Sequence, residues 1–410
     1  MGAPQGSMAR ASALSTDAHP HVLQSVCHAI DNAPSRAISV ATYMELCLYG
    51  QAQSFYRGGG YHRDHAPLGE HGGVKGFTTS PSISQMFGEL LALWCIDMAA
   101  QMSVTESPKR VVELGPGRGE MMADMQRIFV RHAFSRHLSY HCIECSSYYA
   151  EQQRRRATTD IPTFWHESLA SVPDDGIWFI LGNEFFDCFP IHQFSYHDGA
   201  WREIGVCAEQ GTDHPPSLRF TLERQPSPLP DGLYRSLSAV IESPDDGMCL
   251  EYAPLLEVWA QDIIDAVRTH QGCALLLDYG HGGGAVGNSL RAFYDGRMCH
   301  PLCHSGVADL SASVDFSVFA DRASRLGCGV MGLQTQGEFL RRLGIHERAK
   351  QLWRHSDRQP RQRLETGLAL HRLTSPSQMG TLFKVLCLTS HKASVMPCGF
   401  ASPQGKRQQA

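Results

Sequence analysis

The sequence has few lysines, no long apolar run and no excess of charge of one sign. Only 6 of its 36 basic residues are lysines, and 36 Lys and Arg face 41 Asp and Glu, which gives a formal net charge of −5. This near balance excludes a dominant basic surface for DNA or RNA. The better apolar runs, LLALWCI and IWFIL, are far shorter than the roughly 18 residues that a membrane helix needs. With 42% hydrophobic residues among 410, we expect a soluble globular protein of roughly two or three domains.

The 14 cysteines are scattered along the chain, which argues against a small disulfide framework and favours reduced thiols. Residues 1–37 lack the continuous apolar core of a secretory signal, and we expect a flexible extension there. Their Ser and Arg content with only two acids, Asp17 and Asp31, is also compatible with a mitochondrial transit peptide. Residues 390–410 read as a polar tail.

Helix and strand signals alternate along the rest of the chain. ISVATYMELCL, residues 38–48, has helical spacing with Ser39 as a plausible N-cap. The Gly- and His-rich stretch at 57–77 predicts a loop that could serve as a lid, and residues 84–100 predict a buried helix. Beyond these, RVVEL, LSYHCIEC, IWFILG and ALLLD are short apolar runs separated by helical segments. Such runs indicate a parallel sheet covered on both faces, so the expected fold class is doubly wound α/β.

These signals also suggest domain boundaries. We expect the N-terminal extension (1–37) to be followed by a helical and lid segment (38–107). The main α/β domain would span residues 108–389. Short polar and Pro-rich pieces at about 196–245 read as an inserted hairpin region within it.

A glycine-rich turn follows the first predicted strand. RVVEL contains Glu113 near its end and leads through Gly115, Gly117 and Gly119 into a helix. Glycines at the carboxyl end of a strand let a ligand approach the backbone closely. A dinucleotide fingerprint would need Gly or Ala at its sixth position, where this sequence has Glu120, and a carboxylate there would repel a pyrophosphate. The turn suits a ligand without phosphate, and the cationic S-adenosylmethionine fits the electrostatics.

A second acid lies at the end of the next predicted strand. Glu144 follows LSYHCI, 25 residues after Gly119, where a carboxylate can accept both ribose hydroxyl protons of an adenosine. Alternatively, Glu144 simply faces solvent. The glycine turn beside it favours the ribose interpretation.

Polar residues also follow the strand IWFIL, in the segment GNEFFDCFPIHQF. Asn183, Glu184 and Asp187 cluster there beside Phe185 and Phe186, at the edge where a substrate would meet the cofactor. Methyl transfer needs a positioned, desolvated acceptor, and carboxylates beside a guanidinium can hold it bidentately and help to remove a proton. The two acids could instead cap a helix that begins after the strand.

With these segments in view, the sequence resembles the MidA family of class I, Rossmann-like methyltransferases. The resemblance covers about residues 38–388. It rests on GFTTSPSISQMFGELLALW, VVELGPGRGEMMADMQR, GNEFFDCFPIHQF, EYAP, LLLDYGH, LRAFYDGR with ADLSASVDF, TQGEFLRRLGI and MGTLFKVL. Mitochondrial members of the family are assembly factors for respiratory complex I. The resemblance therefore implies S-adenosylmethionine-dependent, type II-like symmetric dimethylation of a protein arginine in a complex I core subunit.

The resemblance also implies roles for individual residues and a compartment. Cofactor binding is implied for Gly115, Gly117, Gly119 and Glu144, to which we add Glu113, and methyl-acceptor binding for Asn183, Glu184 and Asp187. The compartment would be the mitochondrial matrix in a eukaryote and the cytoplasm in a bacterium.

Two carboxylates that are usual in the family are missing from this chain. Gly76 precedes Phe77 where the family reads G-D-F, and Ser82 follows Pro81 where it reads S-P-E. This difference motivates a second hypothesis, a non-catalytic assembly chaperone that retains the cofactor pocket. A nicotinamide-dependent oxidoreductase is a third hypothesis, opposed by Glu120.

The cysteine and histidine pairs do not predict a metal site. Cys142 and Cys145 form a C-x-x-C pair in an expected buried strand, where positions an odd number apart point to opposite faces, unlike a zinc pair. For CHPLCH at 299–304, incidental placement is the simpler interpretation. We therefore expect a protein substrate, no metal and no nucleic-acid partner.

Overall fold

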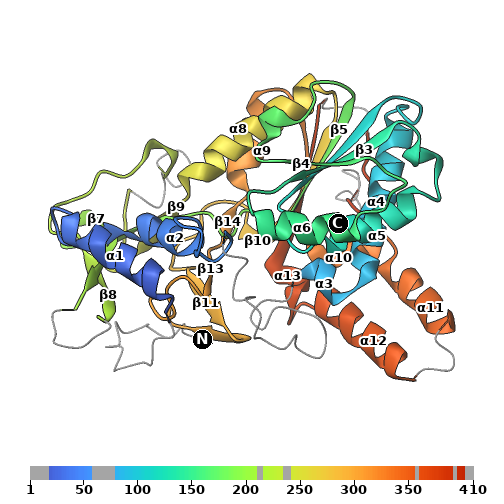
Figure 1. The fold of residues 1–410 in the computed structure, drawn as a ribbon. Coiled ribbons are helices and arrows are strands. Elements are labelled where there is room, and N and C mark those ends of the chain that lie inside the picture. Colours follow the sequence, from blue (N-terminus) through green and yellow to red (C-terminus); the bar gives the residue numbers. More distant parts are fainter. Residues whose placement is uncertain are drawn as a thin grey trace. The chain divides into compact units, whose positions relative to one another are not determined.

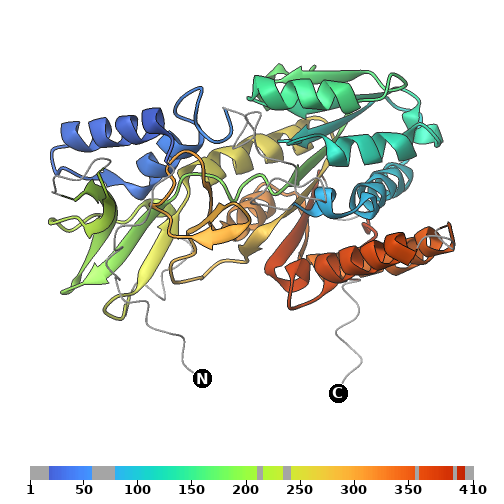
Figure 2. The same ribbon diagram turned by 60° about the horizontal axis from the view of Figure 1, so that its bottom comes forward.

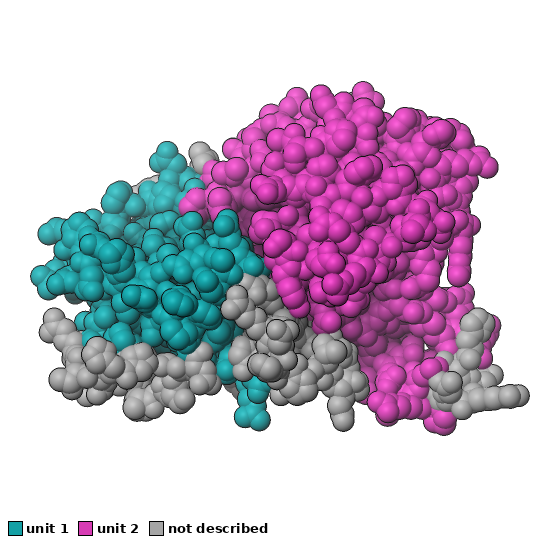
Figure 3. Space-filling view, in the orientation of Figure 1, with its two compact units in different colours: residues 1–66, 190–253, 286–311 teal, residues 67–189, 254–285, 312–410 magenta. Residues whose placement is uncertain are grey.

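The computed structural model describes residues 18–57, 79–209, 216–233, 242–355, 360–390 and 395–401. The chain divides into two compact units, each made of three segments (Figure 3). Unit 1 comprises residues 1–66, 190–253 and 286–311, and unit 2 comprises residues 67–189, 254–285 and 312–410. Both units therefore draw on the stretch 108–389. Gly76, and the predicted lid loop beyond Arg57, lie outside the described residues.

Unit 2 is built on one eight-stranded sheet. Its strands are β2 (Lys109–Leu114), β3 (Leu138–Ile143), β4 (Thr163–His166), β5 (Ile177–Asn183), β10 (Cys273–His281), β14 (Val314–Asp315), β15 (Gly329–Thr335) and β16 (Phe383–Thr389). Their order is β15-β16-β10-β5-β2-β3-β4, and β14 pairs with β10. The strands from β10 to β4 pair in parallel, whereas β16 is antiparallel to both of its neighbours. The predicted α/β sheet is confirmed.

Helices cover both faces of this sheet (Figures 1 and 2). On one face lie α4 (Gln85–Gln101) and α5 (Glu120–Phe129), and on the other lie α8 (Pro254–Thr269) and α9 (Ser317–Arg325). Residues 273–277 of β10 are all fully buried, as expected for a strand that is covered on both sides. The sheet is therefore doubly wound.

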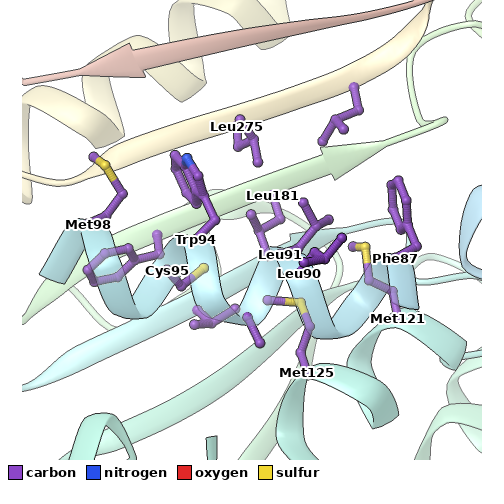
Figure 4. Close-up of a cluster of buried hydrophobic side chains, with 14 of the residues drawn as sticks. Phe87, Leu90, Leu91, Trp94, Cys95, Met98, Met121, Met125, Leu181 and Leu275 are labelled. Atoms are coloured by element: carbon purple, nitrogen blue, oxygen red, sulfur yellow. The ribbon is translucent and has the colours of Figure 1, made fainter. Parts of the chain in front are cut away.

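Helix α4 is buried around most of its circumference, as its sequence MFGELLALWCIDM predicts. Trp94 of this helix packs in one core with Leu181 and Leu275 of the sheet (Figure 4). Each such side chain stabilises the fold by about 1.5–3 kcal/mol on burial. Gly88 allows α4 and α5 to approach, because a Cβ atom at Gly88 would lie 2.8 Å from the Cβ of Asp124.

The remaining helices of unit 2 are short or lie near the carboxyl ends of the parallel strands. They are α3 (Ser80–Ile83), α6 (Ser147–Arg156), α10 (Gln336–Arg342), α11 (Ile345–His355), α12 (Pro360–Thr374) and α13 (Met379–Leu382). Because α10 begins where β15 ends and α13 ends where β16 begins, both lie at the carboxyl edge of the parallel strands. Between β4 and β5 the chain forms only a 3₁₀ turn, Leu169–Ser171.

Unit 1 contains two small antiparallel sheets. Its strands are β1 (Ile38–Ser39), β6 (His192–His197), β7 (Ala200–Ala208), β8 (Leu218–Leu222), β9 (Cys249–Tyr252), β11 (Arg291–Tyr294), β12 (Arg297–Cys299) and β13 (Asp309–Ser311). One sheet has the order β1-β7-β6-β9 with β8 on β7, and the other has the order β12-β11-β13. As predicted, Ser39 is an N-cap: its hydroxyl accepts a hydrogen bond from the Thr42 N–H at the start of α2 (Val40–Leu48).

The N-terminal segment differs from the flexible extension that we expected over residues 1–37. Residues 20–32 form helix α1 (Pro20–Asn32), in which Val22, Leu23, Val26 and Ile30 are buried. Pro20 stands in the first turn, where proline is well tolerated. Apolar residues at helical spacing therefore outweigh the polar composition of this segment.

The C-terminal segment also differs from the polar tail that we expected from residue 390. Within residues 395–401, Phe400 is buried and its ring centroid lies 5.3 Å from that of Phe339. Gln101 donates from Nε2 to the carbonyl of Met396 at 2.9 Å. These contacts fasten the segment to unit 2. Among the described residues, no helix is both long and apolar enough to cross a membrane.

Candidate active site

The sequence-predicted site residues all lie in unit 2, at one edge of its sheet. Strand register pairs Leu114 with Ile143 and with Gly182, and Asn183 with Leu277, so the polar residues at these strand ends share the carboxyl edge. The residues are Glu113, Gly115, Gly117, Gly119, Glu144, Asn183, Glu184 and Asp187. Ligands of doubly wound sheets bind at this edge.

Each glycine of the turn after β2 has a positive φ, at +57° for Gly115, +56° for Gly117 and +82° for Gly119. Residues other than glycine rarely adopt this backbone conformation. A Cβ atom on Gly115 would lie 2.6 Å from the ring of Phe185, whereas a Cβ on Gly117 would meet nothing within 4 Å. The turn thus packs tightly at Gly115 and leaves open space beside Gly117.

Glu120 begins the helix after this turn and is paired with two arginines. Its Oε1 atom lies 3.3 Å from Arg156 and 3.7 Å from Arg118. The carboxylate charge that we expected to repel a pyrophosphate is therefore partly compensated. The argument against a dinucleotide then depends on the missing sixth-position glycine.

Glu113 is almost completely buried at the end of β2. Its Oε2 accepts a hydrogen bond from the hydroxyl of Tyr140 on β3. Burial raises the pKa of its carboxyl from 4.5 to about 8, although the Tyr140 bond opposes this shift. A cation placed beside Glu113 would stabilise the ionised form.

Glu144 is fixed by Gln153 of α6. Its Oε1 accepts from the Ser146 N–H at 2.8 Å, and its Oε2 accepts from Gln153 Nε2 at 2.9 Å. Gln153 Nε2 also donates to the carbonyl of Gly117 at 2.7 Å, and its Oε1 accepts from the Trp165 indole at 2.8 Å. Gln153 is fully buried and so couples the glycine turn to Glu144.

The sequence analysis missed Gln153. It lies on α6, one of the helical segments expected between the strands, but the sequence pattern did not indicate which face of this helix meets the glycine turn. Glu144 does not simply face solvent, because it is half-buried and both of its carboxylate oxygens accept hydrogen bonds; this burial raises the pKa of its carboxyl.

Glu184 directly follows β5 and has a positive φ of +49°. Its Oε1 accepts from the Ser80 N–H at 2.7 Å and from Asn183 Nδ2 at 3.2 Å. Its Oε2 and the Asn183 Oδ1 are buried and have no hydrogen-bond partner among the described residues. Although Glu184 as a residue is only half-buried, its carboxylate is shielded, and this burial raises its pKa from 4.5 to about 7.

Asp278 of β10 is a further acid at this edge. It is fully buried, and its Oδ2 accepts from the backbone N–H groups of Phe185 at 3.1 Å and Phe186 at 2.8 Å. Its pKa is raised to about 7, first by burial and then by the charge of Glu184. The sequence analysis identified the strand ALLLD but not the role of Asp278. The signal was available, because Asp278, like Glu113, is an acid near the end of a buried apolar strand.

Asp187 is buried in the turn that follows Glu184. Its carbonyl accepts a hydrogen bond from the Ala312 N–H at 2.7 Å. No helix begins between Glu184 and β6, since residues 184–191 form bends, a turn at 187–188 and irregular structure. The alternative that Glu184 and Asp187 cap a helix is therefore wrong.

The other polar residues considered from the sequence lie outside this arrangement. Ser82 donates its hydroxyl to the Thr79 carbonyl at 2.8 Å within α3. Cys142 is buried in β3, whereas Cys145 is exposed beyond the end of the strand. Within the described ranges, no group of three or more His, Cys, Asp or Glu residues is arranged to hold a metal ion.

The carboxylates and positive-φ glycines at this edge are chemically suited to a ligand that carries a positive charge and a diol. The open space beside Gly117, the buried Glu113 and the restrained Glu144 form one run of residues along the edge. Over residues 90–334, the sequence matches the model of a family described as S-adenosyl-L-methionine-dependent methyltransferases. The chain belongs to this family.

Curated relatives of this S-adenosylmethionine-dependent methyltransferase cover most of its length. A protein of Drosophila melanogaster, named protein arginine methyltransferase NDUFAF7 homolog, mitochondrial, is 33% identical over 379 residues, which are 86% of this chain and 81% of that protein. The human protein arginine methyltransferase NDUFAF7, mitochondrial, is 32% identical over 382 residues, 87% of this chain and 80% of that protein. The resemblance to the MidA family and the cofactor prediction are thus confirmed.

A solved structure has the same fold. A COG1565 superfamily member from Burkholderia thailandensis, bound to S-adenosyl-homocysteine, superposes with a TM-score of 0.74 at 20% sequence identity, over 92% of this methyltransferase and 94% of that chain. A native structure of a COG1565 superfamily protein from the same organism gives a TM-score of 0.73 at 21% identity. The Rossmann-like methyltransferase architecture is therefore confirmed.

Proposed function

We propose that this methyltransferase modifies arginine side chains of a partner protein, by type II-like symmetric dimethylation of a respiratory complex I core subunit during complex I assembly in the mitochondrial matrix. The names of the Drosophila and human relatives support the arginine specificity and the mitochondrial location. The observation that carries the proposal is the buried, unpartnered Glu184 Oε2. A guanidinium N–H would supply the donor that this atom lacks.

The cofactor would be held by residues of the β2 and β3 ends. S-adenosylmethionine supplies a methyl group on a positively charged sulfur. Gly115, Gly117 and Gly119 would admit it close to the backbone, and Glu113 would face its positive charge. Hydrogen bonds from Ser146 and Gln153 orient the Glu144 carboxylate, which would accept the two ribose hydroxyls.

The methyl acceptor would be held by Glu184, Asn183 and Asp187. Ser80 and Asn183 fix Glu184 Oε1, which leaves Oε2 to accept an N–H of the guanidinium. Because its pKa is about 7, Glu184 can also accept the proton that the guanidinium releases when its nitrogen is methylated. Asp278 is a positioning residue, since it holds the two backbone N–H groups that follow Glu184.

Mass spectrometry of arginines in the complex I core subunits tests the proposal. Methylation should be present with the wild type and lost with Glu184→Gln and with Gly117→Val. If methylation persists unchanged in Gly117→Val, the assignment of the cofactor turn is wrong. If it persists unchanged in Glu184→Gln, Glu184 has no part in catalysis.

The same variants separate an enzyme from a non-catalytic chaperone. In cells that lack the protein, Glu184→Gln should bind S-adenosylmethionine but fail to restore complex I assembly. Full restoration by Glu184→Gln without client methylation would favour the chaperone hypothesis.

A further inference from the structure

Three large apolar side chains near the candidate active site are exposed to solvent. Leu364 and Leu368 of α12 are 64% and 60% exposed, and Leu382 of α13 is 51% exposed. The two helices pack against each other, and α12 also packs against α3 and α10. Figures 1 and 2 show α12 on the outer side of unit 2, beside α11. Clustered exposed leucines are characteristic of interaction surfaces, whereas single ones are common everywhere.

Two leucines of α12 lie in a line on the same helix face as Arg372, which is at the end of the helix linked to Glu184. Leu364, Leu368 and Arg372 are spaced at i, i+4 and i+8, so they share one face of the helix. At 1.5 Å per residue, Leu368 and Leu364 lie about 6 Å and about 12 Å along the axis from Arg372. The positive charge of Arg372 acts on Glu184, whose pKa it lowers against the larger effect of burial.

Hydrogen bonds connect the same end of α12 to Glu184. The Leu373 carbonyl accepts from Gln336 Nε2 at 3.1 Å, and Gln336 Oε1 accepts from the Ser80 hydroxyl at 3.3 Å. The Ser80 N–H in turn donates to Glu184 Oε1 at 2.7 Å. Gln336 and Ser80 are fully buried, so the C-terminal end of α12 is held close to the candidate acceptor site.

The charge on this line indicates the character of its partner. Arg372 is exposed and, within the described part of the chain, has no ion-pair partner within 4 Å. The basic residues of α12 that lie toward its other end include Arg361, which is paired with Glu365 at 2.9 Å. The helix therefore offers a row of two leucines that ends in an available positive charge.

We propose that Leu364, Leu368 and Arg372 form a docking line for a helical segment of the substrate protein, with apolar side chains one turn apart and a carboxylate facing Arg372. This inference rests on the proposed function, because it assigns a binding surface to the protein that carries the target arginine. Apolar contacts would supply most of the affinity, and the carboxylate would set the direction of the segment toward Glu184. The acceptor site then selects the arginine, and the docking line selects the protein.

Fluorescence anisotropy with a synthetic probe tests the docking line directly. The probe is a labelled amphipathic peptide helix with leucines at i and i+4 and glutamate at i+8, and its counterpart has lysine at i+8. The wild type should bind the glutamate peptide more tightly than the lysine peptide. Leu364→Asp/Leu368→Asp should weaken binding at least about tenfold, and Arg372→Glu should reverse the preference between the peptides.

Leu93→Asp is the matched control, because Leu93 is 48% exposed on α4 of the same unit. It should leave peptide affinity unchanged, and the melting temperatures of all variants should match that of the wild type, since the altered side chains are exposed. Equal affinity of the wild type and Leu364→Asp/Leu368→Asp for the glutamate peptide, or no binding by the wild type, would overturn the docking line.

Transfer of labelled methyl groups separates this inference from the proposed function. The substrate is the glutamate peptide extended by an arginine-containing segment, compared with that segment alone. We expect KM for the extended peptide to rise at least about tenfold in Leu364→Asp/Leu368→Asp, with kcat and the KM of the short segment unchanged. If no arginine is labelled while the anisotropy results hold, the arginine proposal fails and the docking surface stands. If arginine is labelled with equal KM in both proteins, the docking line fails and the proposed function stands.

Discussion

The carboxylate of Asp278 accepts a hydrogen bond from the backbone N–H of Phe186 at 2.8 Å. The same oxygen accepts a second bond from the N–H of Phe185. Two neighbouring strands, β5 and β10, are thereby joined beyond their regular pairing. The turn that carries Glu184 is fixed by an acid that would not itself touch the methyl acceptor.

Replacing this acid by its amide should loosen the turn. Asp278→Asn keeps one acceptor oxygen, but its NH₂ group would face a backbone N–H, because Asp278 also accepts from Tyr279 at 2.8 Å. We expect the free energy of unfolding to fall by about 1–3 kcal/mol, and kcat to fall more than the affinity for S-adenosylmethionine. Urea unfolding, calorimetry and methyl transfer measure these quantities. Asp321→Asn, at an exposed position of α9, should change none of them.

Replacing Gly117 in the glycine turn should weaken cofactor binding by more than backbone strain alone can explain. Gly117→Ala and Gly327→Ala both place a Cβ at a positive φ with nothing within 4 Å, and each should lower the free energy of unfolding by about 1–2 kcal/mol. Gly327 precedes β15, at the opposite edge of the sheet. Only Gly117→Ala should weaken S-adenosylmethionine binding in calorimetry, by about tenfold or more. Equal affinities in the two variants would show that the cofactor does not approach Gly117.

Glu113 should make the stability of the protein depend on pH. Burial raises the pKa of its carboxyl from 4.5 to about 8, so between these values the folded protein retains a proton that the unfolded chain has lost. Its contribution to stability is complete below about pH 4.5 and is lost as the pH rises toward 8, by up to about 1.4 kcal/mol per pH unit. The test is urea unfolding at a series of pH values. In Glu113→Gln, the free energy of unfolding should lack the decrease with rising pH that this one carboxyl causes in the wild type. An unchanged slope would contradict the raised pKa.

Glu113 should also make cofactor affinity depend on pH. A cation bound beside it favours the ionised carboxylate, so the affinity for S-adenosylmethionine should rise as the pH increases toward 8. The affinity for S-adenosyl-homocysteine, whose sulfur is neutral, should rise less, and Glu113→Gln should remove the difference between the two ligands. Calorimetry at matched pH values measures both. If the two affinities respond equally in the wild type, Glu113 does not face the sulfonium.

Gln153 should affect ribose recognition through Glu144. Gln153→Leu removes the amide that donates to Glu144 Oε2 and to the carbonyl of Gly117. The affinity for S-adenosylmethionine should therefore fall about tenfold. The preference of the protein for S-adenosylmethionine over its 2′-deoxy analogue should fall as well. Gln126→Leu is the control, since Gln126 is a buried glutamine of α5 that bonds to Thr163 and Thr158. Both variants should lose about 1–3 kcal/mol of stability, and only Gln153→Leu should alter ligand affinity.

The sequence predicted the parts of the site that depend on a single strand end. Glu113, Glu144 and Glu184 each stand at the end of an apolar run, and parallel pairing brings such ends to one edge. It did not predict Gln153 or Asp278, whose roles arise from contacts between elements far apart in the chain. Pairing of β5 with β10 joins residues about 90 positions apart, and no local pattern specifies such a partner.

The same limit applies to the ends of the folded chain. The polar composition of residues 1–37 led us to predict a flexible extension, although the apolar residues of α1 have helical spacing. Phe400 packs against Phe339, and a short segment of seven described residues has no periodicity from which burial can be inferred. The burial of Phe400 therefore follows from tertiary packing alone, whereas α1 follows the helical spacing of its apolar residues.

The interleaving of the two units has a consequence for how the chain folds. Unit 1 needs residues from three stretches that end at 311, and unit 2 needs residues that extend to the C-terminal segment. On the ribosome, β1 must wait for its partner β7, about 170 residues later, and β10 must wait for β16. Such non-local pairing is slow and leaves strand edges exposed meanwhile. The chain should therefore depend on chaperones during synthesis, and neither unit can be expressed alone as one continuous fragment.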